Sequence, residues 1–130
     1  MGIYLTAGAV LDGQPNSGID RSAPSGANDP MSGLVFWEDP NNMPAGSRAT
    51  HKIWSNNAQN LHGTVYFPQA ILNLGCHANV GSASDCTIIV AYNLVAFQSA
   101  NIVLNSNYAA GIIPAPNGVG NTATGSVLTK

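Results

Sequence analysis

The chain has 130 residues, of which 45% are hydrophobic but only 8% are charged, and its four basic and six acidic residues give a formal net charge of -2. A typical soluble domain has about 25% charged residues. Four cations are too few to neutralise the several phosphates that nucleic-acid binding requires, or to form the Lys and Arg clusters that anionic membranes attract. The length predicts one domain, residues 1–130.

The composition also predicts the class of fold. The chain contains 14 Gly and 8 Pro together with many Asn and Ser residues, whereas Glu, Lys, Arg and Gln are scarce. Gly, Pro, Asn and Ser favour turns and interrupt helices, and the scarce residues are strong helix formers. We therefore expect an all-β domain with tight corners.

In chain order, residues 1–31 predict a strand followed by a long loop rich in Pro, Gly and Ser. Residues 32–107 are predicted to form the repeat core of the domain, and residues 108–130 a loose C-terminal segment. Within the core, the apolar run 34–37 predicts a buried strand. The segment 61–74 predicts a pair of strands broken near Pro68, and nearly all of the stretch from Thr87 to Leu104 is strand-like.

An internal repeat is the most informative feature of this core. GTVYFPQAILNLG (63–75) aligns with NLVAFQSANIVLN (93–105) at an offset of thirty residues. The apolar residues alternate within each unit, which is the period of a strand with one buried face. We expect the two segments to stack with Val65 over Val95 and Phe67 over Phe97. A further step of thirty toward the N-terminus puts Val35 and Trp37 on the same inward positions.

Repeats at a fixed period are the signature of a solenoid, in which stacked units bury a continuous core. The predicted fold is therefore a short right-handed β-helix (β-solenoid) with long loops. The alternative is a β-sandwich whose hairpins resemble one another by chance.

The two cysteines, Cys76 and Cys86, lie ten positions apart across Gly- and Ser-rich sequence. In an exported protein they would form a disulfide that closes this loop. The alternatives are two buried thiols, or a zinc site completed by His77 and Asp85. No signal peptide and no apolar run near ~18 residues is present, so we expect this segment neither to insert into a membrane nor to carry its own export address.

No pattern in the chain predicts catalysis. The three histidines, His51, His62 and His77, are scattered in turn-rich sequence, and neither a nucleophile elbow nor a phosphate-binding loop is present. Ionisable groups for acid-base chemistry are few. We expect a protein that is not an enzyme.

One group of oxygen ligands could hold a cation. Glu38 and Asp39 are adjacent, and Asn41 follows them. Closely spaced carboxylate and amide oxygens suit calcium, although acids and Asn after a strand also form simple turns. Calcium at these residues is the one cofactor that we consider.

Exposed aromatic rings could bind sugar. If Val65 and Phe67 point inward, then Tyr66 points outward, and we assign Phe36 and Trp54 to the outer surface as well. These three residues are the candidates for stacking on a glycan.

The stretch from residue 32 to residue 107 resembles the C-terminal region of TadG-like proteins of the Tad (Flp) pilus-assembly system. The segments that carry the resemblance are GLVFWED (33–39), LHGTVYFP (61–68), LNLG (72–75) and CTIIVA (86–91), followed by Phe97 and Asn101. The resemblance implies an extracytoplasmic accessory of pilus biogenesis, in the periplasm or at the cell surface, and it supplies no catalytic residue.

The sequence thus leads to two functional hypotheses. The first is a non-catalytic structural or protein-interaction domain of a pilus-assembly-related bacterial protein, whose partners are other envelope or pilus-assembly proteins. The alternative is a carbohydrate-binding or adhesin module of the cell surface, with a glycan as its partner.

Overall fold

The computed structural model describes residues 1–105, 113, 114 and 116, and all regular secondary structure in this part of the chain is β-strand. The all-β prediction is confirmed. The predicted loose segment 108–130 lies outside the described residues except at 113, 114 and 116. The strands are β1 (Ile3–Leu5), β2 (Asp12–Gly13), β3 (Arg21–Ser22), β4 (Leu34–Glu38), β5 (Thr50–Ile53), β6 (Leu61–Leu74), β7 (Asn79–Val80), β8 (Thr87–Ala96) and β9 (Asn101–Ile102).

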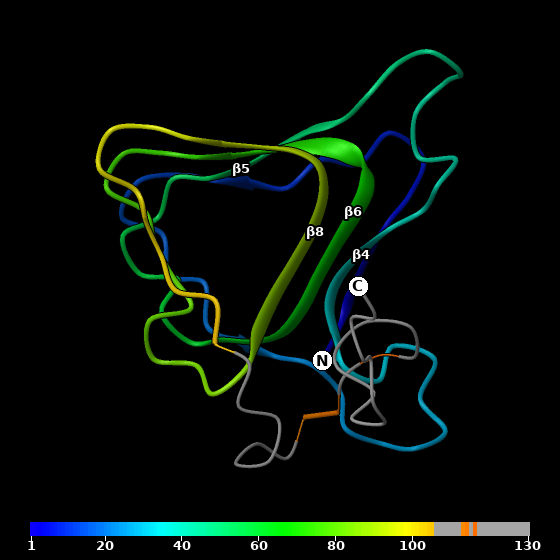
Figure 1. Ribbon diagram of the computed structural model, residues 1–130. Helices are drawn as coiled ribbons and strands as arrows, with labels where there is room; N and C mark the ends of the chain where they lie inside the picture. The colour runs from blue at the N-terminus through cyan, green and yellow to red at the C-terminus, as the bar shows by residue number, and fades with distance from the viewer. Residues whose placement is uncertain (106–112, 115, 117–130) are drawn as a thin grey trace, which may run out of the picture.

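Every strand pair among the described residues is parallel. On one side of the molecule β1, β4, β6 and β8 lie in that order, and on the next side the order is β2, β5, β6 and β8. β6 and β8 are long enough to run through the bend between the two sides (Figure 1). The alternative of a β-sandwich is wrong, because sandwiches are built from antiparallel strands.

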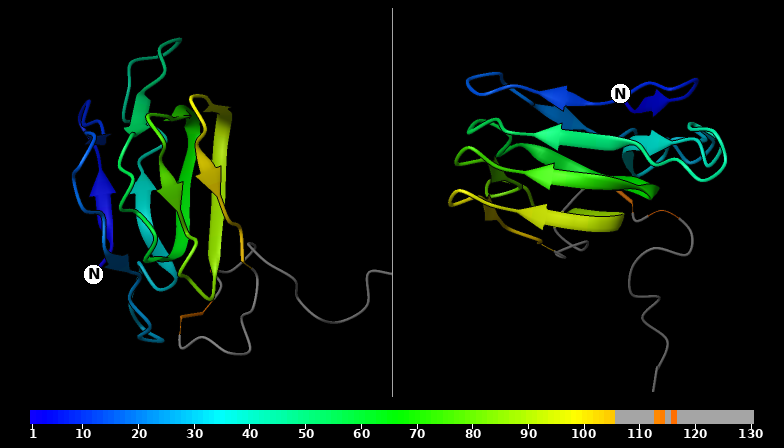
Figure 2. Two further views of the ribbon diagram at one scale, coloured as in Figure 1. Left: turned by 90° about the vertical axis from the view of Figure 1, so that its left-hand side faces the viewer. Right: turned by 90° about the horizontal axis from the view of Figure 1, so that it is seen from above.

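Parallel neighbours require a crossover connection, which is usually a helix. Here the chain instead returns around a third side through loops and short strands. Followed from the N-terminus, the path runs counterclockwise in Figure 1, and its blue passes lie behind the yellow one. Figure 2 shows these passes side by side, in the order of the sequence. The result is a curled, all-parallel sheet around one interior.

The register of β6 on β8 differs from the one that the sequence repeat predicts. Val65 pairs with Ile89, twenty-four residues further on, and Leu72 pairs with Leu94, twenty-two residues further on. The predicted stacking of Val65 over Val95 and Phe67 over Phe97 is therefore wrong. The two-residue difference arises at the bend, where β6 has three residues between Phe67 and Ile71 and β8 has one.

The interior is filled by alternate residues of the strands, as the period of two requires. Each Å² of apolar surface that is buried from water stabilises the fold by about 25 cal/mol, so the large side chains of β6 contribute most to this core. The largest apolar side chains that are fully buried are Phe36, Phe67, Ile53, Leu61, Leu72, Leu74, Val35, Val65 and Val80.

The corners that follow β6 and β8 have the same unusual backbone. Cys76 and His77 have φ values of 53° and 63°, and Gln98 and Ser99 have values of 52° and 59°. The His77 N–H donates to the Gln98 carbonyl at 3.1 Å, so the two corners lie against each other. Left-handed conformations cost non-glycine residues about 1–3 kcal/mol each, so the stacked geometry holds them in place.

A stacked pair of asparagine side chains, called the asparagine ladder below, follows these corners. Asn79 of β7 pairs with Asn101 of β9, twenty-two residues further on, and the Asn101 side-chain amide donates to Asn79 Oδ1 at 3.1 Å. Stacked Asn side chains of this kind bond along the direction in which parallel strands repeat. The ladder fixes the same offset as Leu72 and Leu94.

The predicted disulfide is wrong, because the sulfurs of Cys76 and Cys86 are not bonded to each other. The Gly63 N–H donates to the Cys86 carbonyl, which places Cys86 near the start of β6, whereas Cys76 follows the end of that strand. The segment between them returns along the third side of the curled sheet instead of forming a local loop. The Cys76 thiol donates a hydrogen bond to Gln98 Oε1 at 3.3 Å.

Candidate functional site

The predicted calcium ligands point in different directions. Glu38, the last residue of β4, is 1% exposed and points into the interior, whereas Asp39 points to the surface. The Asp39 carboxylate accepts hydrogen bonds from the Tyr4 hydroxyl and, at 2.8 Å, from the Asn41 N–H. This is an Asx-type turn. Calcium stays a prediction. The described residues contain no group of three His, Cys, Asp or Glu side chains that could hold a metal ion, so the cysteines do not form a zinc site with His77 and Asp85 there.

The Tyr4 and Asp39 side chains change each other's acidity. The pKa of Tyr4 is raised, first by its hydrogen bond to Asp39, and the pKa of Asp39 is lowered, first by its hydrogen bond to Tyr4. Both pKa shifts favour the state in which the Tyr4 phenol stays protonated and donates a hydrogen bond to the ionised Asp39 carboxylate.

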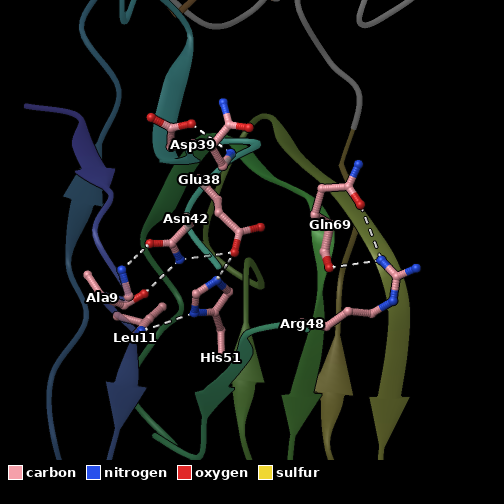
Figure 3. Close-up of polar contacts among 10 residues, drawn as sticks. Ala9, Leu11, Glu38, Asp39, Asn42, Arg48, His51 and Gln69 are labelled. Atoms are coloured by element: carbon pink, nitrogen blue, oxygen red, sulfur yellow. Dashed lines mark hydrogen bonds and ion pairs between the residues drawn. The ribbon is translucent and has the colours of Figure 1, made fainter. Parts of the chain in front are cut away.

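Inside the bend, Glu38 belongs to a buried polar cluster with Asn42 and His51. Glu38 Oε1 lies 3.2 Å from Asn42 Nδ2 and 3.3 Å from His51 Nε2. Asn42 also donates to the Ala9 carbonyl and accepts the Gly8 N–H, each at 3.0 Å. The cluster therefore ties β4 and β5 to the turn after β1 (Figure 3).

The hydrogen bonds of His51 define its protonation state. Its Nδ1 accepts the Leu11 N–H at 3.1 Å, so the proton of the neutral ring is on Nε2 and points to Glu38. Burial lowers the pKa of His51, and the charge and hydrogen bond of Glu38 oppose this shift in part. The neutral ring gives Glu38 a hydrogen bond but no compensating positive charge.

One atom of this cluster has no partner. Glu38 Oε2 is buried and makes no hydrogen bond to any described residue. A cavity of about 210 Å³ lies beside it, lined by Glu38, Asp39, Pro40, Asn42, Met43, Pro44, Ala45, Gly46, Ser47, Arg48, Ala49 and Gln69. In Figure 3 the free oxygen points to the side on which Gln69 and Arg48 lie.

Arg48 forms part of the wall of this cavity. Its Nη1 donates to the carbonyl oxygen and to the side-chain Oε1 of Gln69, each at 3.2 Å. Its guanidinium also lies over the Tyr92 ring, 3.5 Å from the centroid, which is a cation–π contact. The cavity thus has an acceptor on one wall and a charged donor on another.

The aromatic candidates are arranged differently from the prediction. Phe36 is 1% exposed and packs in the core, so its assignment to the surface is wrong. A bulge in β4 between Leu34 and Phe36 shifts the alternation by one residue, and such a slip exchanges the two faces of a strand. As a result, Trp37 takes the outward position.

The outward rings form a column across three strands. Tyr4 pairs with Trp37, and Trp37 pairs with Tyr66, so the three rings follow one another along the stacking direction. The Tyr4 and Trp37 ring centroids are 4.8 Å apart. Tyr66 was predicted to be outward, and its half-buried position beside Trp37 agrees with that. Trp54 follows β5 on the other side of the bend and packs edge-on against Phe97 at 6.2 Å.

Sequence reasoning missed Asn42, His51, Arg48, Tyr4 and Trp37 as members of a site. These residues are distant in the sequence, and only the register brings them together. The one available signal was the position of Glu38 directly after an apolar run, because strand alternation can turn such an acid inward.

Among the described residues, no helix is long and apolar enough to cross a membrane. We also compared the chain with protein-family models, with curated proteins and with solved structures, and none of them matches it.

Proposed function

We propose that the chain forms a short right-handed β-solenoid and serves as a non-catalytic structural or protein-interaction domain of an extracytoplasmic, pilus-assembly-related bacterial protein. The fold proposal is supported by the all-parallel register, by the asparagine ladder and by the direction of the path, which advances toward the viewer as it turns counterclockwise. Right-handed crossovers are also the rule between parallel strands.

The observation that carries the interaction role is the outer edge of β8. Among the described residues β8 pairs with β6 alone, and Tyr92, Leu94 and Val95 on it are 59%, 42% and 38% exposed. An unpaired edge with exposed apolar side chains is a template for another strand. The partner would be a protein that adds an extended, partly apolar segment to β8.

The buried His51 supports a role without catalysis. Its Nδ1 is occupied by a backbone N–H and its Nε2 by Glu38, so neither ring nitrogen is available for proton transfer to a substrate. An acid-base catalyst must reach the proton that it moves. The remaining support is the small number of ionisable residues.

An edge substitution tests the interaction role. The protein with Leu94→Lys is compared with the unchanged protein and with Val10→Lys, which adds the same charge at another apolar residue that is 50% exposed. Affinity purification from the native cell envelope should recover a specific partner with the unchanged protein and with Val10→Lys, but not with Leu94→Lys. The same partner recovered with all three would contradict the role of β8.

The extracytoplasmic location now rests on the resemblance to TadG-like proteins, because the predicted disulfide no longer supports export. Fractionation of the native host tests it directly. We expect the native protein in the periplasmic or surface fractions, and recovery in the cytoplasm alone would contradict both the location and the pilus-assembly proposal.

The column of Tyr4, Trp37 and Tyr66 favours a second candidate, carbohydrate binding. Tyr4 is 47% exposed, and aromatic rings in a row present apolar faces on which sugar rings can stack. A glycan array tests this candidate, with Trp37→Ala expected to abolish binding and Trp54→Ala, outside the column, expected to retain it. Absence of reproducible binding by the unchanged protein would contradict it.

A further inference from the structure

The free oxygen of Glu38 indicates that a hydrogen-bond donor is absent from the site. A buried carboxylate is stable only where its oxygens are bonded, and nearly all buried polar atoms in proteins have a partner. Glu38 Oε1 has two, Asn42 and His51, whereas Oε2 has none among the described residues. The cluster holds the carboxylate in one orientation, and Glu38 is among the residues that line the cavity.

The polar groups on the cavity wall define the chemistry of its occupant. In an ionised carboxylate, Glu38 Oε2 accepts hydrogen bonds and donates none. The guanidinium of Arg48 donates and accepts none, and its hydrogen bonds to Gln69 use only Nη1. A hydroxyl group both donates and accepts. Neighbouring hydroxyls on one molecule can therefore bond to both groups at once.

The size and charge of the cavity limit which kinds of ligand it can bind. A volume of about 210 Å³ is below the ~300–1,000 Å³ of sites for drug-sized ligands, so one small unit fits. A metal cation is disfavoured, because Arg48 places a positive charge in the lining of the same cavity and calcium requires six to eight oxygen ligands. The second acid of the lining, Asp39, is already bonded to Tyr4 and Asn41.

We propose that this cavity binds a single saccharide unit, with one hydroxyl donating to Glu38 Oε2 and another accepting from Arg48. The inference rests on the carbohydrate-binding candidate and names the part of the site that recognises the sugar. Asp39 lines the cavity and accepts the Tyr4 hydroxyl, so the Tyr4 end of the aromatic column lies next to the cavity. A longer glycan could place one unit in the cavity and stack the next units on Tyr4 and Trp37.

The test is calorimetric titration with methyl glycosides of common hexoses and with an array-selected oligosaccharide. Glu38→Gln replaces the accepting oxygen by a donor, and Asp20→Asn makes the same chemical change at an exposed acid as the control. We expect Glu38→Gln to bind the preferred methyl glycoside at least about tenfold more weakly, because one buried hydrogen bond to a charged group is lost. Asp20→Asn should bind like the unchanged protein.

Two further variants separate the possible failures. If Glu38→Gln does not fold, as judged by circular dichroism, Arg48→Met provides the test, with a similar loss expected. Trp37→Ala should weaken binding of the oligosaccharide more than binding of the methyl glycoside. Full oligosaccharide binding by both Glu38→Gln and Arg48→Met, with loss in Trp37→Ala, would overturn the cavity but retain the carbohydrate candidate.

The remaining outcomes each overturn the inference. If the unchanged protein binds no sugar in either form, both the cavity and the carbohydrate candidate fail. If calcium chloride alone binds and Glu38→Gln abolishes that binding, the occupant is a cation and the saccharide inference is wrong.

Discussion

His51 and Ile53 lie two residues apart on β5, and both are completely buried, yet their surroundings differ. Ile53 pairs with Leu74 and belongs to an apolar region that extends along β6. His51 pairs with Leu72 and stacks against Phe67 at 4.1 Å, but its nitrogens bond to Glu38 and to the backbone of Leu11.

The comparison teaches that one interior is stabilised in two ways. The apolar region gains from area removed from water and has no directional requirement. The polar cluster gains little net free energy from each hydrogen bond, but it loses much if any partner is removed. Shape alone is sufficient for the first region, whereas the second requires every donor and every acceptor to have a partner. Within that cluster Glu38 Oε2 is the exception that suggests a ligand.

The largest effect is expected from Phe67→Ala, which damages both regions at once. Phe67 is fully buried, with ring centroids 6.1 Å from Phe36 and 4.1 Å from His51. The substitution should lower the free energy of unfolding by about 3–5 kcal/mol. Urea denaturation measures this, with Val10→Ala at the surface as a control. A loss below about 1 kcal/mol would show that Phe67 is not in the core.

The next effect concerns the polar cluster. His51→Leu leaves the Leu11 N–H without an acceptor and removes a donor from Glu38, so it should cost about 3 kcal/mol. The double variant Glu38→Leu/His51→Leu removes the buried carboxylate as well and should be more stable than His51→Leu. Thermal denaturation of the single and double variants compares them. Equal or lower stability of the double variant would contradict this account of the cluster.

Acid should weaken the polar cluster before the apolar region. The pKa of His51 is lowered from 6.5 mainly by burial, so the unfolded chain binds a proton more readily than the folded protein. The free energy of unfolding should be constant above about pH 7.5 and should fall below about 6.5, by up to about 1.4 kcal/mol per pH unit. Denaturation between pH 5 and 8 should show a smaller slope in Glu38→Leu/His51→Leu. An identical slope would exclude His51 as its source.

The smallest effect is expected outside the interior, at the asparagine ladder. Asn101→Ala removes one solvent-exposed hydrogen bond to Asn79 and should cost about 0.5 kcal/mol. Asn105→Ala is the control. A loss as large as that of His51→Leu would mean that the ladder, not the interior, holds the parallel strands together.

The sequence predicted the class of fold but not its register. Turn residues and alternating apolar residues were sufficient for an all-β chain. The thirty-residue alignment failed because β6 pairs with β8 at an offset of twenty-four residues before the bend and twenty-two after it, and the bend contains three residues in β6 but one in β8. A weaker signal had the correct offset, since Ala-Asn-Val at 78–80 and Ala-Asn-Ile at 100–102 are twenty-two residues apart.

The candidate site depended on the registers of β1 on β4 and of β4 and β5 on β6, and it was predicted only in part. Glu38 was selected for its neighbour Asp39, although its actual partners, Asn42 and His51, are buried with it. Tyr66 was placed correctly by alternation within β6. Phe36 and Trp37 were exchanged, because a bulge cannot be identified from apolar periodicity alone. The disulfide prediction failed for a related reason, since a short sequence separation does not mean proximity when the intervening residues run from the end of β6 back to its start.

The register of β6 on β8 is the central claim, because it aligns the two longest strands through the bend, and a pair of engineered cysteines tests it most directly. Tyr66 and Val90 pair across the sheet, and neighbouring strands ~4.8 Å apart suit a disulfide. In a Cys76→Ala/Cys86→Ala background, Tyr66→Cys/Val90→Cys should form a disulfide readily under mild oxidation. Tyr66→Cys/Ala96→Cys, the thirty-residue offset, should remain reduced. Rapid cross-linking of the second pair, with none in the first, would contradict the structure described here.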